Sequence, residues 1–219
     1  MEIDFITTNH KKTKRNYLAR VNSVNKAKAA KLAKKWGFDY WDGSRDINYG
    51  GYHYDGRWSP IAKKMIKHYK LKENARILDV GCGKGFLMYE FKKLLPKCQV
   101  YGQDISNYAI KNSKKEIKKK IKQGCASKLK FKSNYFDLVV SLNTLHNLYC
   151  YDLIKALKEI ERVSKRNKYI CVESYRNETE KVNLLYWQVT CESFYTPLEW
   201  KWFLEQGKYK GDHSFIFFQ

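Results

Sequence analysis

The sequence lacks the features that would place it in a membrane or outside the cell. It has no apolar run of membrane-spanning length and no apolar signal segment at its N-terminus. Its six cysteines form no CxxC pair and have no histidines at zinc-ligand spacing. We therefore expect a cytoplasmic protein that does not bind membranes, keeps its thiols reduced and needs no metal. Its 219 residues suffice for one ordinary hydrophobic core.

The most informative segment that is present reads ILDVGCGKG, at residues 77–85. An apolar strand leads into three alternate glycines, at positions 81, 83 and 85, and an apolar helical pattern follows. Glycine has no Cβ, so a ligand can approach the backbone closely at such a turn. A second strand ends at Asp104, nineteen residues after Gly85, where an acidic residue of a Rossmann-like half site binds ribose hydroxyls.

The glycine spacing also indicates which nucleotide is bound. A dinucleotide site has the pattern GxGxxG and places a pyrophosphate at the helix N-terminus. Here the pattern is GxGxG and Asp79 stands beside it. A carboxylate would repel a pyrophosphate but suits an ammonium group. S-adenosylmethionine (SAM) has an amino acid end, a sulfonium and a ribose, and no phosphate.

On these motifs the chain resembles the class I SAM-dependent methyltransferases over roughly residues 42–219. The second motif is YGQDIS (101–106) and the fourth is FDLVVSLNTLHNL (136–148). The chain also resembles uncharacterised bacterial methyltransferases of surface-polysaccharide loci, in the pattern that runs from YWDG through SYRNETEK to the final SFIFF. The resemblance implies SAM as cofactor, S-adenosylhomocysteine as product, and cofactor contacts from Asp79, Gly81, Cys82, Gly83, Gly85, Asp104, Ile105, Cys125, Ala126 and Leu142. The family commonly has an acidic residue where Cys125 stands, so the backbone there would have to bind the adenine.

Strands alternate with helices along most of the chain, which predicts an α/β fold with a parallel sheet. We expect strands near residues 76–80, 98–103, 120–124, 136–141, 168–173 and 214–218, and helices near 25–36, 60–69, 152–163 and 197–206. The fold class is a Rossmann-like, doubly wound, mostly parallel sheet of six or seven strands. A seventh strand could come from LLYWQV at 184–189. Residues 1–58 would form a polar arm (1–24), a helix and an aromatic lid loop (38–58), and residues 59–219 the methyltransferase domain.

The acceptor would meet residues outside the cofactor motifs. His146 and Asn143 follow the fourth strand, at the sheet edge where open α/β folds bind ligands, and are the catalytic candidates. His146 could act as a base or simply pack a short helix. The candidates for binding the acceptor are Arg45, Tyr49, Tyr54, Arg57, Tyr175, Arg176 and Trp187. We expect the lid to close over the site, with Arg57 and Arg176 holding an anionic acceptor.

The net charge of +21 admits three interpretations. Residues 1–137 hold thirty-two Lys/Arg against twelve Asp/Glu, whereas residues 138–219 hold eleven against ten. The three are compositional drift with solubility, an anionic small substrate, and RNA. Thirty-five of the forty-three basic residues are lysine, which favours drift, because phosphate and base recognition favour the fork of arginine. No [DN]PP[YFW] motif follows the fourth strand and no cysteine stands between Asp137 and Tyr149, which disfavours N6-adenine and 5-methylcytosine chemistry.

We therefore predict a SAM-dependent methyltransferase that modifies an O or N atom of a small polar acceptor able to carry negative charge. A sugar, a sugar nucleotide or a phosphorylated metabolite fits that description. The alternative is an RNA methyltransferase that uses the basic N-terminal two-thirds to bind phosphates. The sequence leaves a monomer and a homodimer equally open.

Overall fold

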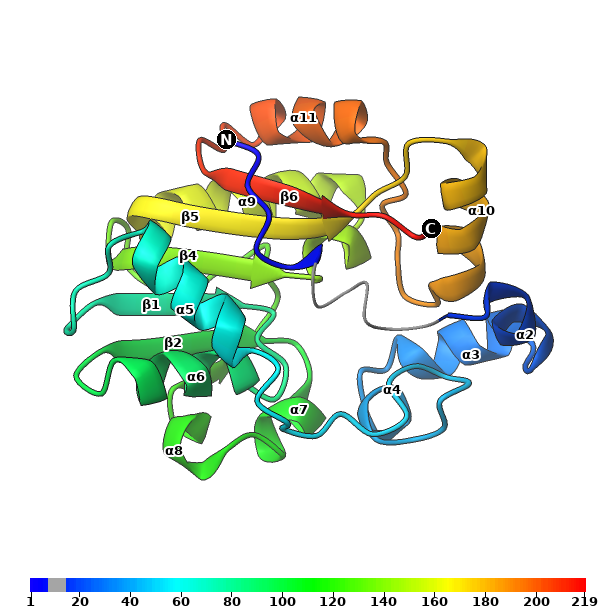
Figure 1. The fold of residues 1–219 in the computed structure, drawn as a ribbon, viewed down its shortest axis with the longest axis horizontal. Coiled ribbons are helices and arrows are strands. Elements are labelled where there is room, and N and C mark those ends of the chain that lie inside the picture. Colours follow the sequence, from blue (N-terminus) through cyan, green and yellow to red (C-terminus); the bar gives the residue numbers. More distant parts are fainter. Residues whose placement is uncertain (8–14) are drawn as a thin grey trace.

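The computed structural model describes residues 1–7 and 15–219, so part of the predicted arm, residues 8–14, lies outside the described residues. Its centre is one sheet of six strands in the order β3-β2-β1-β4-β5-β6 (Figure 1). The strands are β1 (Arg76–Val80), β2 (Gln99–Asp104), β3 (Ile121–Gln123), β4 (Phe136–Leu142), β5 (Ser164–Glu173) and β6 (Asp212–Ile216). Every pairing between these strands is parallel. The predicted α/β, Rossmann-like class is confirmed.

Helices precede the sheet and connect its strands. The N-terminal helices are α2 (Tyr17–Asn22), α3 (Lys26–Ala33), α4 (Phe38–Trp41) and α5 (Ser59–His68). The later ones are α6 (Phe86–Leu94), α7 (Asn107–Lys111), α8 (Lys115–Lys118), the 3-10 turn η1 (Leu145–Asn147), α9 (Cys150–Val163), α10 (Glu178–Trp187) and α11 (Pro197–Gln206). Several begin where the sequence supplies a cap: Asn25 precedes α3, and Thr196 with Glu199 forms a capping box on α11.

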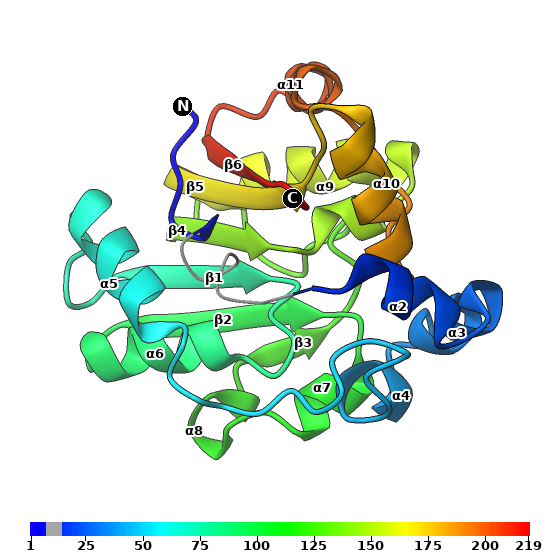
Figure 2. The ribbon, with the colours of Figure 1, turned by 45° about the vertical axis from the view of Figure 1, so that its right-hand side comes forward.

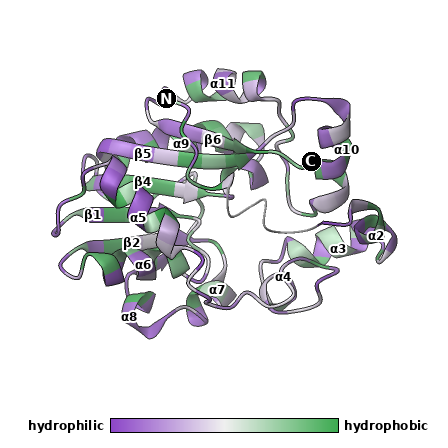
Figure 3. Ribbon diagram, viewed as in Figure 1, coloured by the Kyte–Doolittle hydropathy of each residue, from purple (hydrophilic) through white to green (hydrophobic). Residues whose placement is uncertain are grey.

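Successive strand residues face opposite sides of the sheet and build two cores. Ile77, Val100 and Leu138 face helices α5 and α6, together with Tyr169 of β5. The neighbouring positions, such as Leu78 and Val139, face α9 and α11. Figure 3 shows this pattern as hydrophobic strands between helices whose outer surfaces are hydrophilic. In the described parts of the chain, no helix is both long and apolar enough to cross a bilayer.

Three expectations about secondary structure are corrected. Residues 184–189 do not supply a strand, because most of them belong to α10. The lid loop is not wholly irregular, since α4 lies within it. The first residues are not a solvated arm: Glu2 pairs with His213 beside β6, and Phe5 and Ile6 are buried in the core under α5. The edge of β6 that a further strand could occupy is thus partly covered by the N-terminus.

The N-terminal helices lie beyond the carboxyl ends of the strands. Figures 1 and 2 agree that α2, α3 and α4 gather there, with α10 close to α2. Helices α3 and α4 have a small core of their own, in which Ala29, Ala33, Tyr40 and Trp41 pack with Val189. Ligands bind at this edge of open parallel sheets, so the N-terminal segment is placed to form a wall of the site.

Candidate cofactor and acceptor site

A pocket opens at the carboxyl ends of β1, β2 and β4. Nine of the ten residues predicted to bind the cofactor line it: Asp79, Gly81, Cys82, Gly83, Asp104, Ile105, Cys125, Ala126 and Leu142. The tenth, Gly85, does not line the pocket but begins α6 in the left-handed conformation, where a Cβ would lie 2.4 Å from Ile117. The chain turns from β1 into α6 around this pocket, as the sequence predicts.

The glycines of the turn also make room for other parts of the protein. Gly81 and Gly83 have φ of 76° and 54°, which favour glycine strongly. A Cβ on Gly83 would come within 2.6 Å of the Trp41 ring, and one on Gly81 within 2.1 Å of Thr144 Oγ1. Trp41 therefore sits directly against the glycine turn, and that contact requires a glycine beneath it.

Asp104 is fixed at the end of β2 by two backbone amides. Its Oδ2 accepts from Gly83 N and its Oδ1 accepts from Ser106 N, both at 2.7 Å. A carboxylate has about four acceptor positions, so each oxygen can accept one more hydrogen bond from the pocket side. Asp104 can thus hold a diol while also keeping the glycine turn in register with β2.

Asp79 is a buried acid, and no cation among the described residues forms an ion pair with it. Its side chain is 4% exposed, and burial together with the charge of Asp104 raises its pKa to about 8. Ionising it in this setting is unfavourable unless a positive group binds next to it. This fits the ammonium group of an amino acid ligand and does not fit a phosphate.

We expect SAM binding to release a proton from Asp79. With a pKa of about 8, this acid is mostly protonated at pH 7 in the free protein, and an ammonium partner would hold it ionised. Affinity should therefore rise with pH up to about 8. Titration calorimetry at pH 7 in buffers of different ionisation enthalpy should detect most of one proton released, and none in Asp79→Asn. Equal enthalpies in all buffers for the wild type would contradict this assignment.

Two asparagine side chains present acceptor atoms with no protein partner. Asn143 Oδ1 and Asn147 Oδ1 are buried, and neither accepts a hydrogen bond from any described residue. Both residues line the pocket. Asn143 adopts φ of 54°, a conformation that asparagine tolerates better than most residues. Because a buried acceptor without a donor is costly, these oxygens are suited to a ligand N–H or O–H.

Gln103 is a site residue that the sequence did not reveal. It is 1% exposed and lines the pocket. Its Nε2 donates to Cys125 O at 2.7 Å and Lys128 O at 3.0 Å, and its Oε1 accepts from Lys130 N at 3.0 Å. The loop that would bind adenine is thus held by one amide. The only signal was a polar residue inside an otherwise buried strand.

Aromatic side chains from residues 36–58 supply a further wall of the pocket. The pocket-lining aromatics from this region are Trp36, Tyr40, Trp41, Tyr49, Tyr52 and Trp58. Trp41 and Tyr49 stack with ring centres 5.4 Å apart, and Trp41 Nε1 donates to Ser106 Oγ at 2.9 Å. Tyr49, an acceptor candidate named from the sequence, is part of this wall.

A buried ion pair ties this wall to the glycine turn. Lys84, from the turn itself, donates to both carboxylate oxygens of Asp42 at 2.6 and 2.7 Å and to Tyr52 O at 2.9 Å. Tyr108 OH and Tyr52 N also donate to Asp42, at 2.9 and 3.0 Å. Lys84 is only 4% exposed. No local pattern indicates that the lysine of GCGKG pairs with a residue forty-two positions earlier.

The catalytic candidate His146 does not reach the pocket. It is 2% exposed, and burial lowers its pKa to about 3, so its ring is neutral near pH 7. Its Nδ1 lies 3.4 Å from Glu173 N and its Nε2 lies 3.5 Å from Glu173 Oε2. The packing interpretation of this histidine fits the geometry, and a role as a base in the pocket does not. Asn143 remains in the pocket.

The predicted arginine clamp is also corrected. Arg57 pairs with Asp55 at 2.6 Å and its side chain is 58% exposed. Arg176 pairs with Glu180 four residues along and stacks over Phe217. Each arginine is neutralised by a carboxylate close in sequence, and neither lines the pocket.

The remaining acceptor candidates divide into two groups, of which only one lies near the site. Tyr54 donates to Glu90, and Tyr175 carries Lys181 over its ring, both outside the pocket lining. Arg45 and Trp187 do not line the pocket either, but they contact each other. Arg45 also donates to the backbone oxygen of Tyr49, a residue that does line it, at 3.1 Å.

Comparison with known proteins identifies methyltransferases as the relatives of this chain. Residues 71–208, more than half of the chain, match the family model described as a methyltransferase domain. An uncharacterized methyltransferase of Schizosaccharomyces pombe, C1B3.06c, is 32% identical over 119 residues, which are 49% of this chain and 41% of that protein. The malonyl-(acyl-carrier protein) O-methyltransferase of Legionella pneumophila is 33% identical over 42% of this chain and 33% of its own length. This chain thus matches less than half of either relative.

Solved structures share the fold. The YcgJ protein of Bacillus subtilis superposes with a TM-score of 0.55 at 22% identity, over 67% of this chain and 66% of that one. The family match over residues 71–208 contains the glycine turn, Asp104 and the asparagines after β4, all of which line the pocket. The chain therefore belongs to the class I SAM-dependent methyltransferases.

Proposed function

We propose that this chain transfers a methyl group from SAM to an oxygen or nitrogen of a small polar acceptor. The observation that carries the proposal is the pocket itself. One side presents the buried acids Asp79 and Asp104 at a glycine turn, and the other presents two partnerless amide oxygens, on Asn143 and Asn147, beside an aromatic wall. The first side suits SAM, and the second suits an acceptor that donates hydrogen bonds.

The residues that line the pocket match the chemical groups of SAM. Asp79 would pair with the ammonium group, Asp104 would accept the ribose hydroxyls, and Gly81 and Gly83 would let the backbone approach the methionine portion. The loop at Cys125 and Ala126, held by Gln103, would contact the adenine. When bound, SAM supplies an electrophilic methyl group on its sulfonium.

The protein's own contribution would be positioning and the exclusion of water. Methyl transfer needs the acceptor atom in line with the methyl group, and holding it there can supply much of the acceleration. Asn143 and Asn147 would orient the acceptor through its N–H or O–H groups. Trp41, Tyr49 and Tyr52 would keep water from the reacting atoms. No described residue of the pocket is placed as a strong base, so the acceptor should be a nucleophile of some intrinsic reactivity.

The division of labour along the chain is part of the proposal. Residues 1–58 would supply the aromatic wall of the acceptor side, and residues 59–219 would hold the cofactor and contribute Asn143 and Asn147 to the acceptor side. A sugar, sugar nucleotide or phosphorylated metabolite fits a wall that combines aromatic rings with amide oxygens.

Turnover with methyl-labelled SAM over a panel of sugars, sugar nucleotides and phosphorylated metabolites tests this function. We expect Asn147→Ala to lower kcat/KM for the acceptor by about three- to tenfold, the value of one hydrogen bond, with the Kd for SAM unchanged. The control is Asn112→Ala, whose amide likewise donates to a backbone oxygen of the preceding turn, at 2.8 Å, but lies outside the pocket. Failure of the wild type to bind SAM would refute the function outright.

A further inference from the structure

Three arginines from two segments, residues 15–20 at α2 and the loop after α4, surround one indole ring at the edge of the site. The guanidinium carbons of Arg15, Arg20 and Arg45 lie 5.2, 5.3 and 5.2 Å from the ring centre of Trp187. No two of them can therefore be further apart than about twice that distance. We call Arg15, Arg20, Arg45 and Trp187 the guanidinium cluster. The chain has only eight arginines, so three at one ring is not an effect of its lysine-rich composition.

Two of these arginines donate hydrogen bonds to backbone oxygens, which do not neutralise their positive charge. Arg45 donates to the backbone oxygens of Asn48 and Tyr49, at 2.9 and 3.1 Å. Arg20 donates to the backbone oxygens of Ile47, at 3.1 Å, and Arg45. Among the described residues, neither Arg20 nor Arg45 makes an ion pair with a carboxylate. Arg57, Arg162 and Arg176 differ, because each is paired with an aspartate or glutamate.

Two acids lie near the cluster, and among the described residues neither forms an ion pair with Arg20 or Arg45. Asp46 lies near Arg20, and Glu173 lies near Arg15. Burial raises the pKa of Glu173 to about 8, so it is largely uncharged at neutral pH. Burial, and then the nearby charge of Arg45, lower the pKa of Arg20, although an arginine stays protonated in proteins. The cluster is thus a concentration of positive charge that an oxyanion would stabilise.

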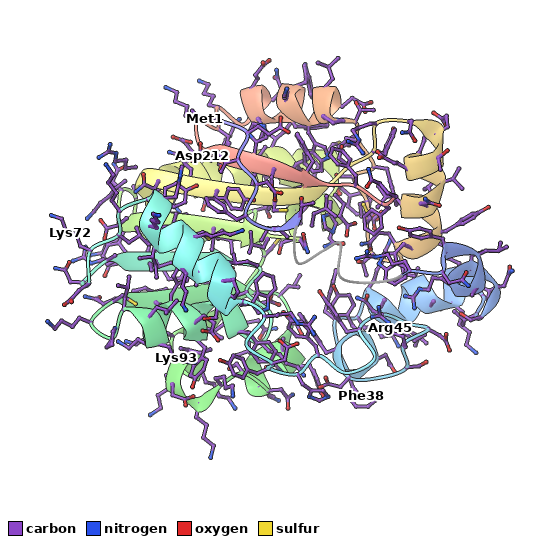
Figure 4. The ribbon with its side chains drawn as sticks, in the orientation of Figure 1. Met1, Phe38, Arg45, Lys72, Lys93 and Asp212 are labelled. Atoms are coloured by element: carbon purple, nitrogen blue, oxygen red, sulfur yellow. The ribbon has the colours of Figure 1, made fainter. Side chains whose placement is uncertain are left out.

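The cluster adjoins the acceptor side of the pocket. Arg45 contacts the backbone of Tyr49, whose ring lines the pocket. Two residues after Trp187, Val189 packs with Tyr40 and Trp41, which also line it. Figure 4 labels Arg45 near α2 and α4, beyond the carboxyl ends of the strands, whereas Lys72 lies at the opposite end of the sheet.

We propose that the guanidinium cluster binds a phosphate or pyrophosphate group of the acceptor. Planar guanidinium groups match the oxygens of phosphate in geometry and charge, and several of them together suit a multiply charged group. The acceptor would then extend from the cluster past Tyr49, with its reacting atom near Asn143 and Asn147. This inference rests on the proposed methyl transfer and narrows its acceptor to a phosphorylated small molecule.

Binding of pyrophosphate, with and without SAM, tests the site directly. We expect Arg20→Gln and Arg45→Gln each to weaken pyrophosphate binding about ten- to hundredfold in calorimetry at physiological salt, since each removes a charge-assisted contact. Arg176→Gln is the matched control, because Arg176 also stacks on an aromatic ring but already has Glu180 as a partner. Its pyrophosphate affinity should stay within twofold of the wild type, and all three variants should keep the wild-type Kd for SAM.

A second measurement covers the case in which the variants do not fold. Pyrophosphate should protect Arg20 and Arg45 of the wild type, but not Arg176, from modification by phenylglyoxal, read by peptide mass spectrometry. Equal pyrophosphate affinity in all variants, or no selective protection, would overturn the proposal even if SAM binds normally. Loss of SAM binding in the wild type would instead refute the methyl transfer itself. A short oligonucleotide that displaces pyrophosphate at physiological salt and binds more tightly would overturn the small-molecule assignment in favour of RNA.

Discussion

Replacing Asp104 by alanine should weaken SAM binding by about 2–3 kcal/mol, or 30- to 150-fold, because two charge-assisted hydrogen bonds to the ribose would be lost. The variant also leaves Gly83 N and Ser106 N without the acceptor that each has at 2.7 Å. The glycine turn would then lose its tie to the end of β2. Calorimetry with SAM and with S-adenosylhomocysteine measures the effect, which should be similar for both because they share the ribose.

Asp137→Ala provides the comparison for this prediction. Its carboxylate also accepts from a backbone amide, Arg76 N at 2.8 Å, but at the start of β1 and outside the pocket. That variant should lose some stability and keep its affinity for SAM. If Asp104→Ala bound SAM as tightly as Asp137→Ala does, Asp104 could not be the residue that holds the ribose.

Replacing Lys84 by methionine should destabilise the protein by about 3 kcal/mol, since removing one partner leaves Asp42 as an uncompensated, largely buried charge. The side chains of the pair are 5% and 16% exposed. For a domain of this size, such a change lowers Tm by roughly 6–12 °C. Burial acts to raise the pKa of Asp42, but the hydrogen bonds from Lys84, Tyr52 and Tyr108 prevail and lower it. The stabilisation by this pair is therefore present at neutral pH and lost as pH falls through the lowered pKa of Asp42.

Two further variants distinguish the effect of losing the Lys84–Asp42 pair from the effect of losing one positive charge. Asp42→Asn in the Lys84→Met background removes the unpaired charge, and its Oδ1 can still accept from Tyr52 N while its Nδ2 can donate to the Tyr108 hydroxyl, so it should recover more than half of the lost stability. Lys97→Met breaks the exposed pair with Glu73, at 2.9 Å, and should change stability by no more than about 0.5 kcal/mol. Equal losses for Lys84→Met and Lys97→Met, measured by denaturant unfolding, would show that the buried pair has no special role.

The Lys84 pair also bears on how the aromatic wall works. One end of the pair is Lys84 of the glycine turn, and the other is Asp42, beside Trp41. The Trp41 ring packs against Gly83, and its Nε1 donates a hydrogen bond to Ser106. The wall is therefore attached to the same turn that would hold the cofactor. We expect Lys84→Met to weaken SAM binding as well as stability, because the wall would lose its fixed position over the turn.

The fold class and the glycine turn with Asp104 could be predicted from the sequence, because each depends on a few neighbouring residues. The alternation of apolar strands and amphipathic helices fixes the α/β class, since the periods of 2 and 3.6 residues are local. The glycine turn and Asp104 were identified because backbone freedom and the spacing between two adjacent strands leave little choice of position. Nine of the ten residues predicted to bind the cofactor line one pocket.

The acceptor side depended on contacts that no local pattern records. Arg57 and Arg176 were expected in the site, but Asp55 and Glu180, two and four residues away, neutralise them on the surface. Arg15, Arg20 and Arg45 instead converge on Trp187, because α2 and the segment after α4 pack against α10. His146 points into the protein toward Glu173 rather than into the pocket. Spacing determines which backbone edge a residue reaches, but the direction of its side chain and its partner depend on the packing of distant segments, which only the tertiary structure decides.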